Sequence, residues 1–158
     1  MKAKKLVTCY LASGWFNEAE EAARKEILEA LEKTEISYFS PKDEVLISNI
    51  SDKSEQKNAF RKDIESINSC DFVVASTVGK DMGTLFEMGF SYANNVPLVI
   101  YFPAPKGTPC NLMLAQSAYA IAQSKDELIQ ILEKLKENNF DFSKKLEFDG
   151  SVEWNLHI

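Results

Sequence analysis

Two carboxylates lie six residues apart in the segment Asp81-Met82-Gly83-Thr84-Leu85-Phe86-Glu87-Met88-Gly89. The apolar run before it, residues 71–77, predicts a buried strand, and the residues after it continue a helical pattern. With a helix beginning near Thr84, Glu87 falls in the first turn, where free backbone N–H groups and the helix dipole favour a negative charge. We therefore expect Glu87 to stay ionised and to be usable as a nucleophile.

The same carboxylates also have a purely structural interpretation, which the sequence leaves open. In that interpretation Asp81 caps the helix and Glu87 belongs to an ordinary acidic first turn. A third carboxylate, Asp63, falls on the apolar face of a helix expected over about residues 54–68. The side chain of Asp63 either faces a pocket or forms an ion pair at the edge of the apolar face, with a cation such as Arg61 or Lys62.

Composition restricts the classes of protein to which the chain can belong. Its 158 residues are 45% hydrophobic and 27% charged, which predicts one globular domain over residues 1–158. The formal net charge of −6 argues against nucleic acid as a partner. No apolar run is long enough to span a membrane, and residues 1–6 lead into a strand pattern without a signal-peptide region. We therefore expect a cytoplasmic protein without a membrane partner.

The cysteines and the histidine exclude several kinds of site. Cys9, Cys70 and Cys110 are odd in number and widely spaced, so they predict neither a disulfide framework nor a zinc cluster. The only histidine, His157, is next to last, which argues against Ser/His or Cys/His catalysis. We expect carboxylates to perform any acid–base chemistry, and we expect no metal site.

Strand and helix patterns alternate along the chain. The expected strands cover residues 5–11, 36–39, 71–77, 97–102 and 118–122, and residues 42–53 are expected to form a long loop. Inward-facing residues are expected to be Ala19, Ala22, Ala23, Ala30 and Leu31 on the first helix, and Phe60, Ile64 and Ile67 on the second. This order predicts a doubly wound, flavodoxin-like α/β domain, whose five-stranded parallel sheet has the order 2-1-3-4-5 and is flanked by helices. Ligands of such folds bind at the carboxyl ends of the strands, where residues 12–16, 77–87 and 103–113 should meet.

Five features in this order resemble the nucleoside 2-deoxyribosyltransferase family. They are Tyr10-Leu11-Ala12-Ser13-Gly14-Trp15-Phe16, Asp63 on the second helix, Asp71 opening the third strand, the segment from Asp81 to Gly89, and Asn111-Leu112-Met113. The resemblance covers residues 6–113, with a weaker similarity at residues 148–152.

The resemblance implies a reaction and three catalytic residues. Members of this family move a 2-deoxyribosyl group between purine and pyrimidine bases through a covalent glycosyl-enzyme, with net retention. By resemblance, Glu87 is the nucleophile, Tyr10 at the end of the first strand orients its carboxylate, and Asp63 faces the base as proton donor. This chemistry implies no cofactor, neither metal nor redox group.

The resemblance also implies how sugar and base are held. Asp81, two residues before Gly83 in the same motif, would bind a deoxyribose hydroxyl, and we expect Gly83 to belong to this substrate-binding turn. Phe16, directly after Trp15, would offer the base an aromatic surface. Deoxynucleosides and free nucleobases are therefore the expected small-molecule partners.

A second subunit is implied as well. Asn111 and Met113 would complete the sugar pocket across a subunit boundary, in a homo-oligomer built from dimers, such as a hexamer, with shared active sites. Two features depart from the family pattern. Residues 41–45 offer acids where an amide often reads the base, and the chain continues past Val152, where Glu153 would stand in for a terminal carboxylate.

Two other functions stay open as alternatives. An N-glycoside hydrolase acting on deoxynucleosides or deoxynucleoside monophosphates would, for the latter, need a phosphate site, but residues 13–16 hold no arginine and Arg24 lies two turns down the helix. A non-catalytic, nucleotide-binding flavodoxin-like module would need an acidic cluster or a hydroxyl-rich loop after the first strand, where only Ser13 is found.

Overall fold

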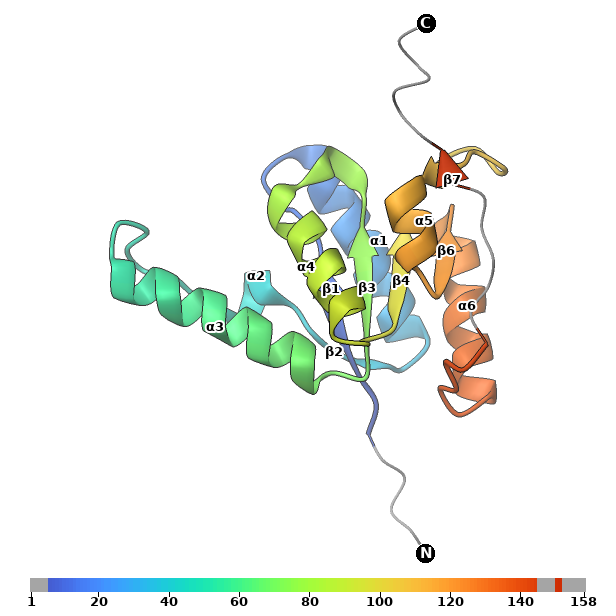
Figure 1. Cartoon of the computed structure of the whole chain (residues 1–158), viewed down its shortest axis with the longest axis horizontal. Helices are drawn as coiled ribbons and strands as arrows, with labels where there is room; N and C mark the ends of the chain where they lie inside the picture. Colours follow the sequence, from blue (N-terminus) through green and yellow to red (C-terminus); the bar gives the residue numbers. More distant parts are fainter. Residues whose placement is uncertain (1–5, 145–149, 152–158) are drawn as a thin grey trace, which may run out of the picture.

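The computed structural model of the chain describes residues 6–144 and 150–151, so Glu153 and His157 lie outside the described residues. Five parallel strands form the main sheet in the order β2-β1-β3-β4-β6 (Figure 1). They are β1 (Thr8–Ala12), β2 (Ser37–Phe39), β3 (Phe72–Ser76), β4 (Leu98–Tyr101) and β6 (Ala120–Ala122). The order confirms the expected 2-1-3-4-5 arrangement, because the short strand β5 (Cys110–Asn111) belongs to a separate pair.

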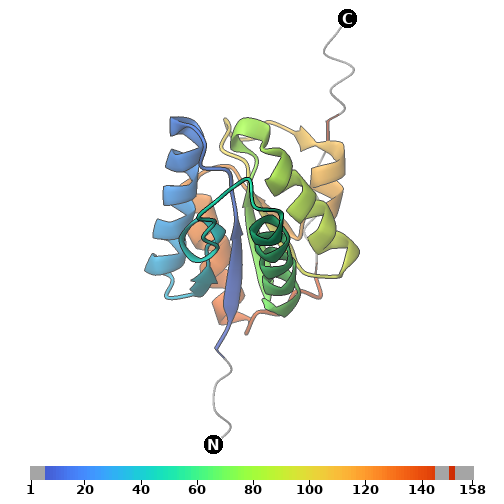
Figure 2. The same cartoon turned by 90° about the vertical axis from the view of Figure 1, so that its left-hand side faces the viewer.

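Helices cover both faces of this sheet (Figure 2). One face packs against α1 (Glu18–Lys33) and α6 (Lys125–Glu137). The other packs against α3 (Lys53–Ser69), α4 (Met82–Ala93) and α5 (Leu112–Ser117). Within residues 6–144 and 150–151, no helix is both long enough and apolar enough to cross a bilayer.

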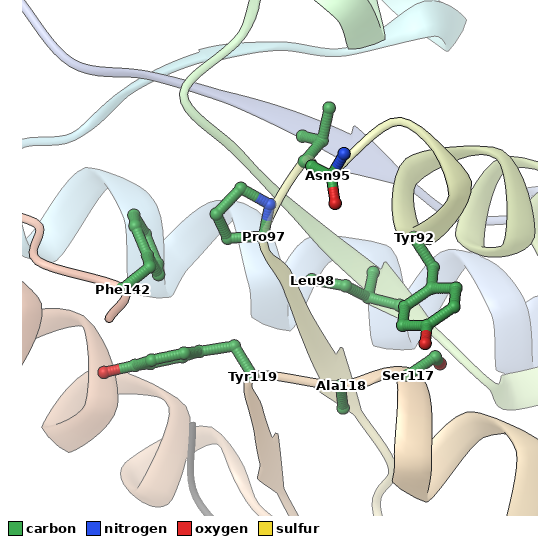
Figure 3. A pocket seen from close by; sticks show the side chains of 9 residues that line it. Tyr92, Asn95, Pro97, Leu98, Ser117, Ala118, Tyr119 and Phe142 are labelled. Atoms are coloured by element: carbon green, nitrogen blue, oxygen red, sulfur yellow. The ribbon is translucent and has the colours of Figure 1, made fainter. Parts of the chain in front are cut away.

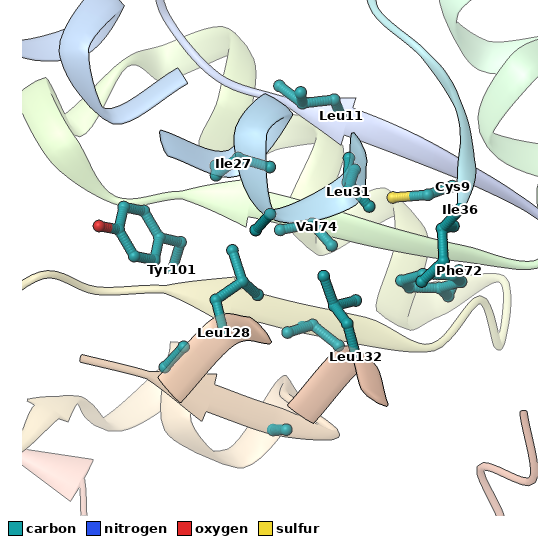
Figure 4. Packing of buried hydrophobic residues seen from close by; sticks show 14 of the residues in the cluster. Cys9, Leu11, Ile27, Leu31, Ile36, Phe72, Val74, Tyr101, Leu128 and Leu132 are labelled. Carbon is teal, nitrogen blue, oxygen red and sulfur yellow. The ribbon is translucent and has the colours of Figure 1, made fainter. Parts of the chain in front are cut away.

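Alternation along the strands divides the core into two layers. Cys9 and Leu11 of β1 pack with Ile27 of α1 and Leu128 of α6 (Figure 4). Tyr10 lies between them in sequence and therefore faces the opposite layer, which contains buried side chains from α3, α4 and α5. This alternation decides on which side of the sheet Tyr10 meets other polar groups.

Two helices bury only part of the face expected of each. Ala23, Ala30 and Leu31 of α1 and Ile67 of α3 are buried as predicted. Ala19 and Ala22 of α1 are exposed, because the buried stripe contains Glu20 and Arg24 together with Ile27. These positions still have helical spacing, but two of them are charged, so a count of apolar residues alone misplaced one edge of the stripe. Phe60 is 58% exposed, because α3 buries only Ile67 near its C-terminal end and projects beyond the sheet (Figure 1).

Two connections contain structure that the sequence patterns did not indicate. The expected long loop after β2 begins with a helical turn, α2 (Pro41–Glu44), with proline at its first position. Strand β5 pairs in parallel with β7 (Gly150–Ser151). A Cβ atom at Gly150 would lie 2.6 Å from the Cα atom of Leu112, so only glycine fits at this contact.

Candidate active site

Tyr10, Asp63 and Glu87 come together on the α3/α4 face of the sheet. Tyr10 is the central residue of β1 and not its end as expected, and its fully buried ring stacks on Phe39 with centroids 5.7 Å apart. Its hydroxyl is close enough to the two carboxylates to lower the pKa of each. The Tyr10 hydroxyl, Oδ1 of Asp63 and Oε2 of Glu87 are nevertheless buried without a hydrogen bond among the described residues.

Three unpaired polar atoms in one place are unusual. Most buried polar groups in folded proteins have a partner, and leaving one unpaired costs roughly 1–3 kcal/mol. A ligand with hydrogen-bonding groups of its own can supply the missing partners. The cluster therefore has the character of a binding site.

Burial controls the ionisation of the two carboxyl groups. It raises the pKa of Glu87 to about 8, with repulsion from Asp63 and Asp81 adding to the rise. Burial also raises the pKa of Asp63 to about 6. Because the two groups interact, both values belong to the pair, and between them the pair holds one proton.

This ionisation overturns one expectation about Glu87. Helix α4 begins at Met82, so Glu87 lies in the second turn and not in the first. There the free N–H groups of the helix start no longer face it, and desolvation dominates. Glu87 is consequently protonated for much of the time near pH 7, whereas the sequence interpretation had it ionised.

Asp81 caps α4. Its Oδ2 atom accepts hydrogen bonds from the backbone N–H and the hydroxyl of Thr84, each 2.8 Å long. These contacts leave Oδ1 for a ligand, so capping and ligand binding are compatible roles. Gly83 lies in the first turn of α4, exposed beside Asp81.

Two aromatic rings follow β1. Trp15 and Phe16 have centroids 5.1 Å apart and planes tilted by 32°, and Phe16 is 72% exposed. The backbone N–H of Phe16 donates to Oε2 of Glu20, 2.9 Å away. An exposed ring held by its backbone offers a flat apolar surface to a planar ligand.

Asn111 and Met113 lie at the start of α5. Asn111 caps this helix, because its Oδ1 atom accepts from the N–H groups of Met113, at 3.0 Å, and Leu114, at 3.4 Å. Met113 is 76% exposed. Met113 is therefore presented on the surface, whereas Asn111 is half-buried.

A separate pocket lies at the amino-terminal ends of β4 and β6 (Figure 3). Pro97 and Leu98, at the start of β4, and Tyr119, just before β6, contribute to its wall. Its lining contains neither aspartate nor glutamate. It therefore lacks the acid–base groups of the Tyr10 cluster and is not the candidate active site.

Comparison with known protein families identifies the family of this chain. Residues 9–122 match the nucleoside 2-deoxyribosyltransferase family. The chain belongs to this family. The match confirms the resemblance inferred from the sequence motifs and extends beyond Met113 to the end of β6.

Solved structures share the fold of this nucleoside 2-deoxyribosyltransferase family member. A 2-deoxyribosyltransferase from Bacillus psychrosaccharolyticus is 24% identical, with a TM-score of 0.68 over 92% of this chain and 100% of that one. A conserved protein from Enterococcus faecalis V583 is 18% identical, with a TM-score of 0.66 over 82% and 99%. The CMP N-glycosidase BcmB from Clostridium botulinum is 20% identical, with a TM-score of 0.51 over 80% and 98%. Among curated protein sequences, none matches significantly.

Sequence reasoning missed Glu20 of this family member. Glu20 is 5% exposed and contacts the loop after β1. One signal was present, because Glu20 follows the helix cap Asn17 at the spacing of a capping box. That spacing predicts an exposed cap, however, and gives no indication of burial.

Proposed function

We propose that this chain transfers a 2-deoxyribosyl group between purine and pyrimidine bases by a retaining double displacement, with Glu87 as the nucleophile. The observation that carries the proposal is the cluster of Tyr10, Asp63 and Glu87, whose buried oxygens lack partners. Retaining glycosyl transfer usually relies on two carboxyl groups beside the glycosidic bond, one as nucleophile and one as acid and base. Membership of the nucleoside 2-deoxyribosyltransferase family supports the same reaction.

In the first step, a carboxylate oxygen of Glu87 forms a bond to C1′ of the deoxyribose while the bond from C1′ to the base nitrogen breaks. The electron pair of the broken bond stays on the base, and Asp63 donates a proton to it. The products are a neutral free base and a glycosyl ester of Glu87.

In the second step, a nitrogen of the incoming base forms a bond to C1′ and the ester bond to Glu87 breaks. The electron pair returns to Glu87, and the proton of the incoming base returns to Asp63. Two inversions at C1′ give net retention. Water in place of the second base would release free deoxyribose, so exclusion of water favours transfer over hydrolysis.

The proton shared by the two carboxyl groups matches this mechanism. Productive attack requires Glu87 ionised and Asp63 protonated, which is one proton for the pair. Between pH values of about 6 and 8 the pair holds that one proton. A bound base that removes the remaining water from Asp63 raises the pKa of this residue further and draws the proton from Glu87.

We assign the remaining predicted residues to substrate binding. Asp81 binds a deoxyribose hydroxyl through the oxygen that Thr84 does not use, beside Gly83. Phe16, next to Trp15, stacks against the base. Deoxynucleosides and free nucleobases are the substrates in this proposal.

The charge around the site favours a neutral donor over a nucleotide. Glu20 and Asp81 bring carboxylates to the loops after β1 and β3, where a phosphate sits in many folds of this class. A 5′-phosphate there would meet these carboxylates and no arginine in residues 13–16, with Lys80, next to Asp81, as a cation of the second loop. This supports nucleosides as donors, although the CMP N-glycosidase from Clostridium botulinum shares the fold.

We further propose that the chain acts as a homo-oligomer built from dimers, such as a hexamer, with Asn111 and Met113 completing a neighbour's site. The apolar residues exposed on α3 and α4 support association. Phe60 is 58% exposed and Phe86 53% exposed, and their rings lie 6.0 Å apart. Uncovered aromatic side chains of this kind are typical of surfaces that bind another protein.

The decisive experiment incubates the pure protein with deoxyinosine or thymidine, with and without adenine or cytosine, and separates all products by chromatography. A new deoxynucleoside that appears only with acceptor base supports transfer. Free base released at the same rate without acceptor identifies a hydrolase and overturns the transfer proposal. Glu87→Ala serves as the negative control and should abolish turnover.

A further inference from the structure

Glu20 is a buried carboxylate that the proposed reaction does not use. It lies in the first turn of α1 and is 5% exposed. Its Oε2 atom accepts the backbone N–H of Phe16 at 2.9 Å, just before the helix begins. An acidic residue that only capped α1 would satisfy the helix from the surface, as acidic first-turn residues usually do. Burial of this carboxylate therefore needs a further explanation.

Two glycines from separate loops enclose the Glu20 carboxylate. A Cβ atom at Gly14, after β1, would lie 2.5 Å from its Oε2 atom. A Cβ atom at Gly79, after β3, would overlap with its Oε1 atom. Gly79 also has a φ of 78°, which favours glycine on its own account. The carboxylate thus fills the space between the two loops, and neither loop leaves room for a side chain there.

These two loops carry the groups that the proposed function assigns to base and sugar. The first continues from Gly14 into Trp15 and Phe16, and the second continues from Gly79 to Asp81. The loops also touch directly, because a Cβ atom at Gly14 would lie 3.1 Å from the Cβ atom of Asp81. The position of Glu20 therefore affects both subsites at once.

We propose that Glu20 is a positioning residue of the active site: its buried carboxylate, held between Gly14 and Gly79 and bonded to Phe16, sets the spacing between the base surface and the sugar-binding Asp81. The roles of Phe16 and Asp81 rest on the proposed function. The spacing of the two loops is a property of the fold alone, so it can be tested without substrate.

The test uses three variants at Glu20 and one control. Glu20→Ala empties the space and leaves the Phe16 N–H unpaired. Glu20→Asp keeps the charge but withdraws the carboxylate by one methylene, and Glu20→Gln keeps the shape and an oxygen for Phe16. Glu18→Ala is the matched control, because Glu18 is an exposed acidic residue of the same helical turn.

The first readout is kinetic. Misplaced binding groups reduce productive complexes, so Glu20→Ala and Glu20→Asp should raise KM for the deoxynucleoside at least about tenfold. Glu20→Gln should restore KM to within about threefold of the wild type, and Glu18→Ala should leave it unchanged. Glu20→Asp carries the test if Glu20→Ala fails to fold. Unchanged KM in folded Glu20→Asp would overturn the proposal, even with a lower Tm, because Glu20 would then be a helix cap only.

The second readout needs no turnover. Trp15 and Trp154 are the two tryptophans of the chain, so Trp154→Phe leaves Trp15 as the single emitter. Acrylamide should quench Trp15 more strongly in Glu20→Asp than in the wild type or in Glu20→Gln, because the loop is no longer anchored. Equal quenching in all variants would overturn the proposal. If the wild type turns over no nucleoside, the proposed function fails, and the quenching result still decides whether Glu20 anchors the loop.

Discussion

One carboxylate oxygen of Asp81 accepts both the backbone N–H and the hydroxyl of Thr84, each at 2.8 Å. Thr84 is 2% exposed, so this double contact is shielded from water. The contact fixes the orientation of the Asp81 carboxylate at the start of α4. A carboxylate whose orientation is fixed before binding loses less conformational freedom when its second oxygen accepts a hydroxyl, as the proposed sugar contact requires.

Asp81→Asn separates capping from sugar binding. Asparagine caps helices about as well as aspartate, so the free energy of unfolding should change by less than about 0.5 kcal/mol. KM for deoxynucleosides should rise about tenfold, since a charged hydrogen bond to the sugar becomes a neutral one. Steady-state kinetics and urea denaturation measure the two effects. An unchanged KM would leave Asp81 as a helix cap only. Thr84→Val is the control for the cap. It removes the hydroxyl that donates to Asp81 and should lower the free energy of unfolding by about 1 kcal/mol.

Glu87→Gln should alter both activity and the pH dependence of stability. The raised pKa means that the folded protein keeps a proton that the unfolded chain releases between pH 4.5 and about 8. The contribution of Glu87 to the free energy of unfolding of the wild type therefore falls as pH rises through this window. Glutamine does not titrate, so the variant lacks this decrease. Its free energy of unfolding relative to the wild type should therefore rise by at least about 2 kcal/mol between pH 4.5 and 8. Urea denaturation at several pH values measures the difference, and transfer activity should vanish. Parallel stability profiles for the two proteins would contradict the raised pKa.

The pair of carboxyl groups predicts a bell-shaped dependence of kcat/KM on pH. Below about pH 6 both groups are protonated and the nucleophile is lost, and above about pH 8 both are ionised and the acid is lost. Asp63→Asn should lower kcat at least about a hundredfold, with little change in KM, and remove the alkaline limb. Glu65→Gln is the control, because Glu65 is an exposed carboxylate on the same helix. An alkaline limb that persists in Asp63→Asn would assign the acid role to another group.

Tyr10→Phe should move the active pH range upward. The Tyr10 hydroxyl lowers the pKa of both carboxyl groups, so its removal raises both values and shifts the profile of kcat/KM to higher pH. Stability should change by no more than about 1 kcal/mol, because the contacts of this hydroxyl with the two carboxyl groups lack the geometry of full hydrogen bonds. Tyr38→Phe is the control, since its hydroxyl binds Glu32 at the surface. The same pH profile in Tyr10→Phe and the wild type would show that Tyr10 does not tune the pair.

Much of the fold could be predicted because its signals are local. Apolar β-rich runs predicted the strands, including the run that contains β3, and their alternation with helices predicted the order of the main sheet. Asp81 and Glu87 were recognisable as a pair because strand, turn and helix periodicity already defined their spacing. The β5–β7 pair was not predictable, because each strand is only two residues long and the two strands lie far apart in the sequence.

The sequence by itself determined the residue types available for chemistry, the alternation that builds a parallel sheet, and the family motifs from Tyr10 to Met113. Only the tertiary structure decided that Tyr10 faces α3 and α4, that burial raises the pKa of Glu87, and that Gly14 and Gly79 enclose Glu20. The reason is physical. Periodicity and capping depend on near neighbours in the chain, whereas desolvation, charge repulsion and close packing depend on groups that folding brings together from distant segments.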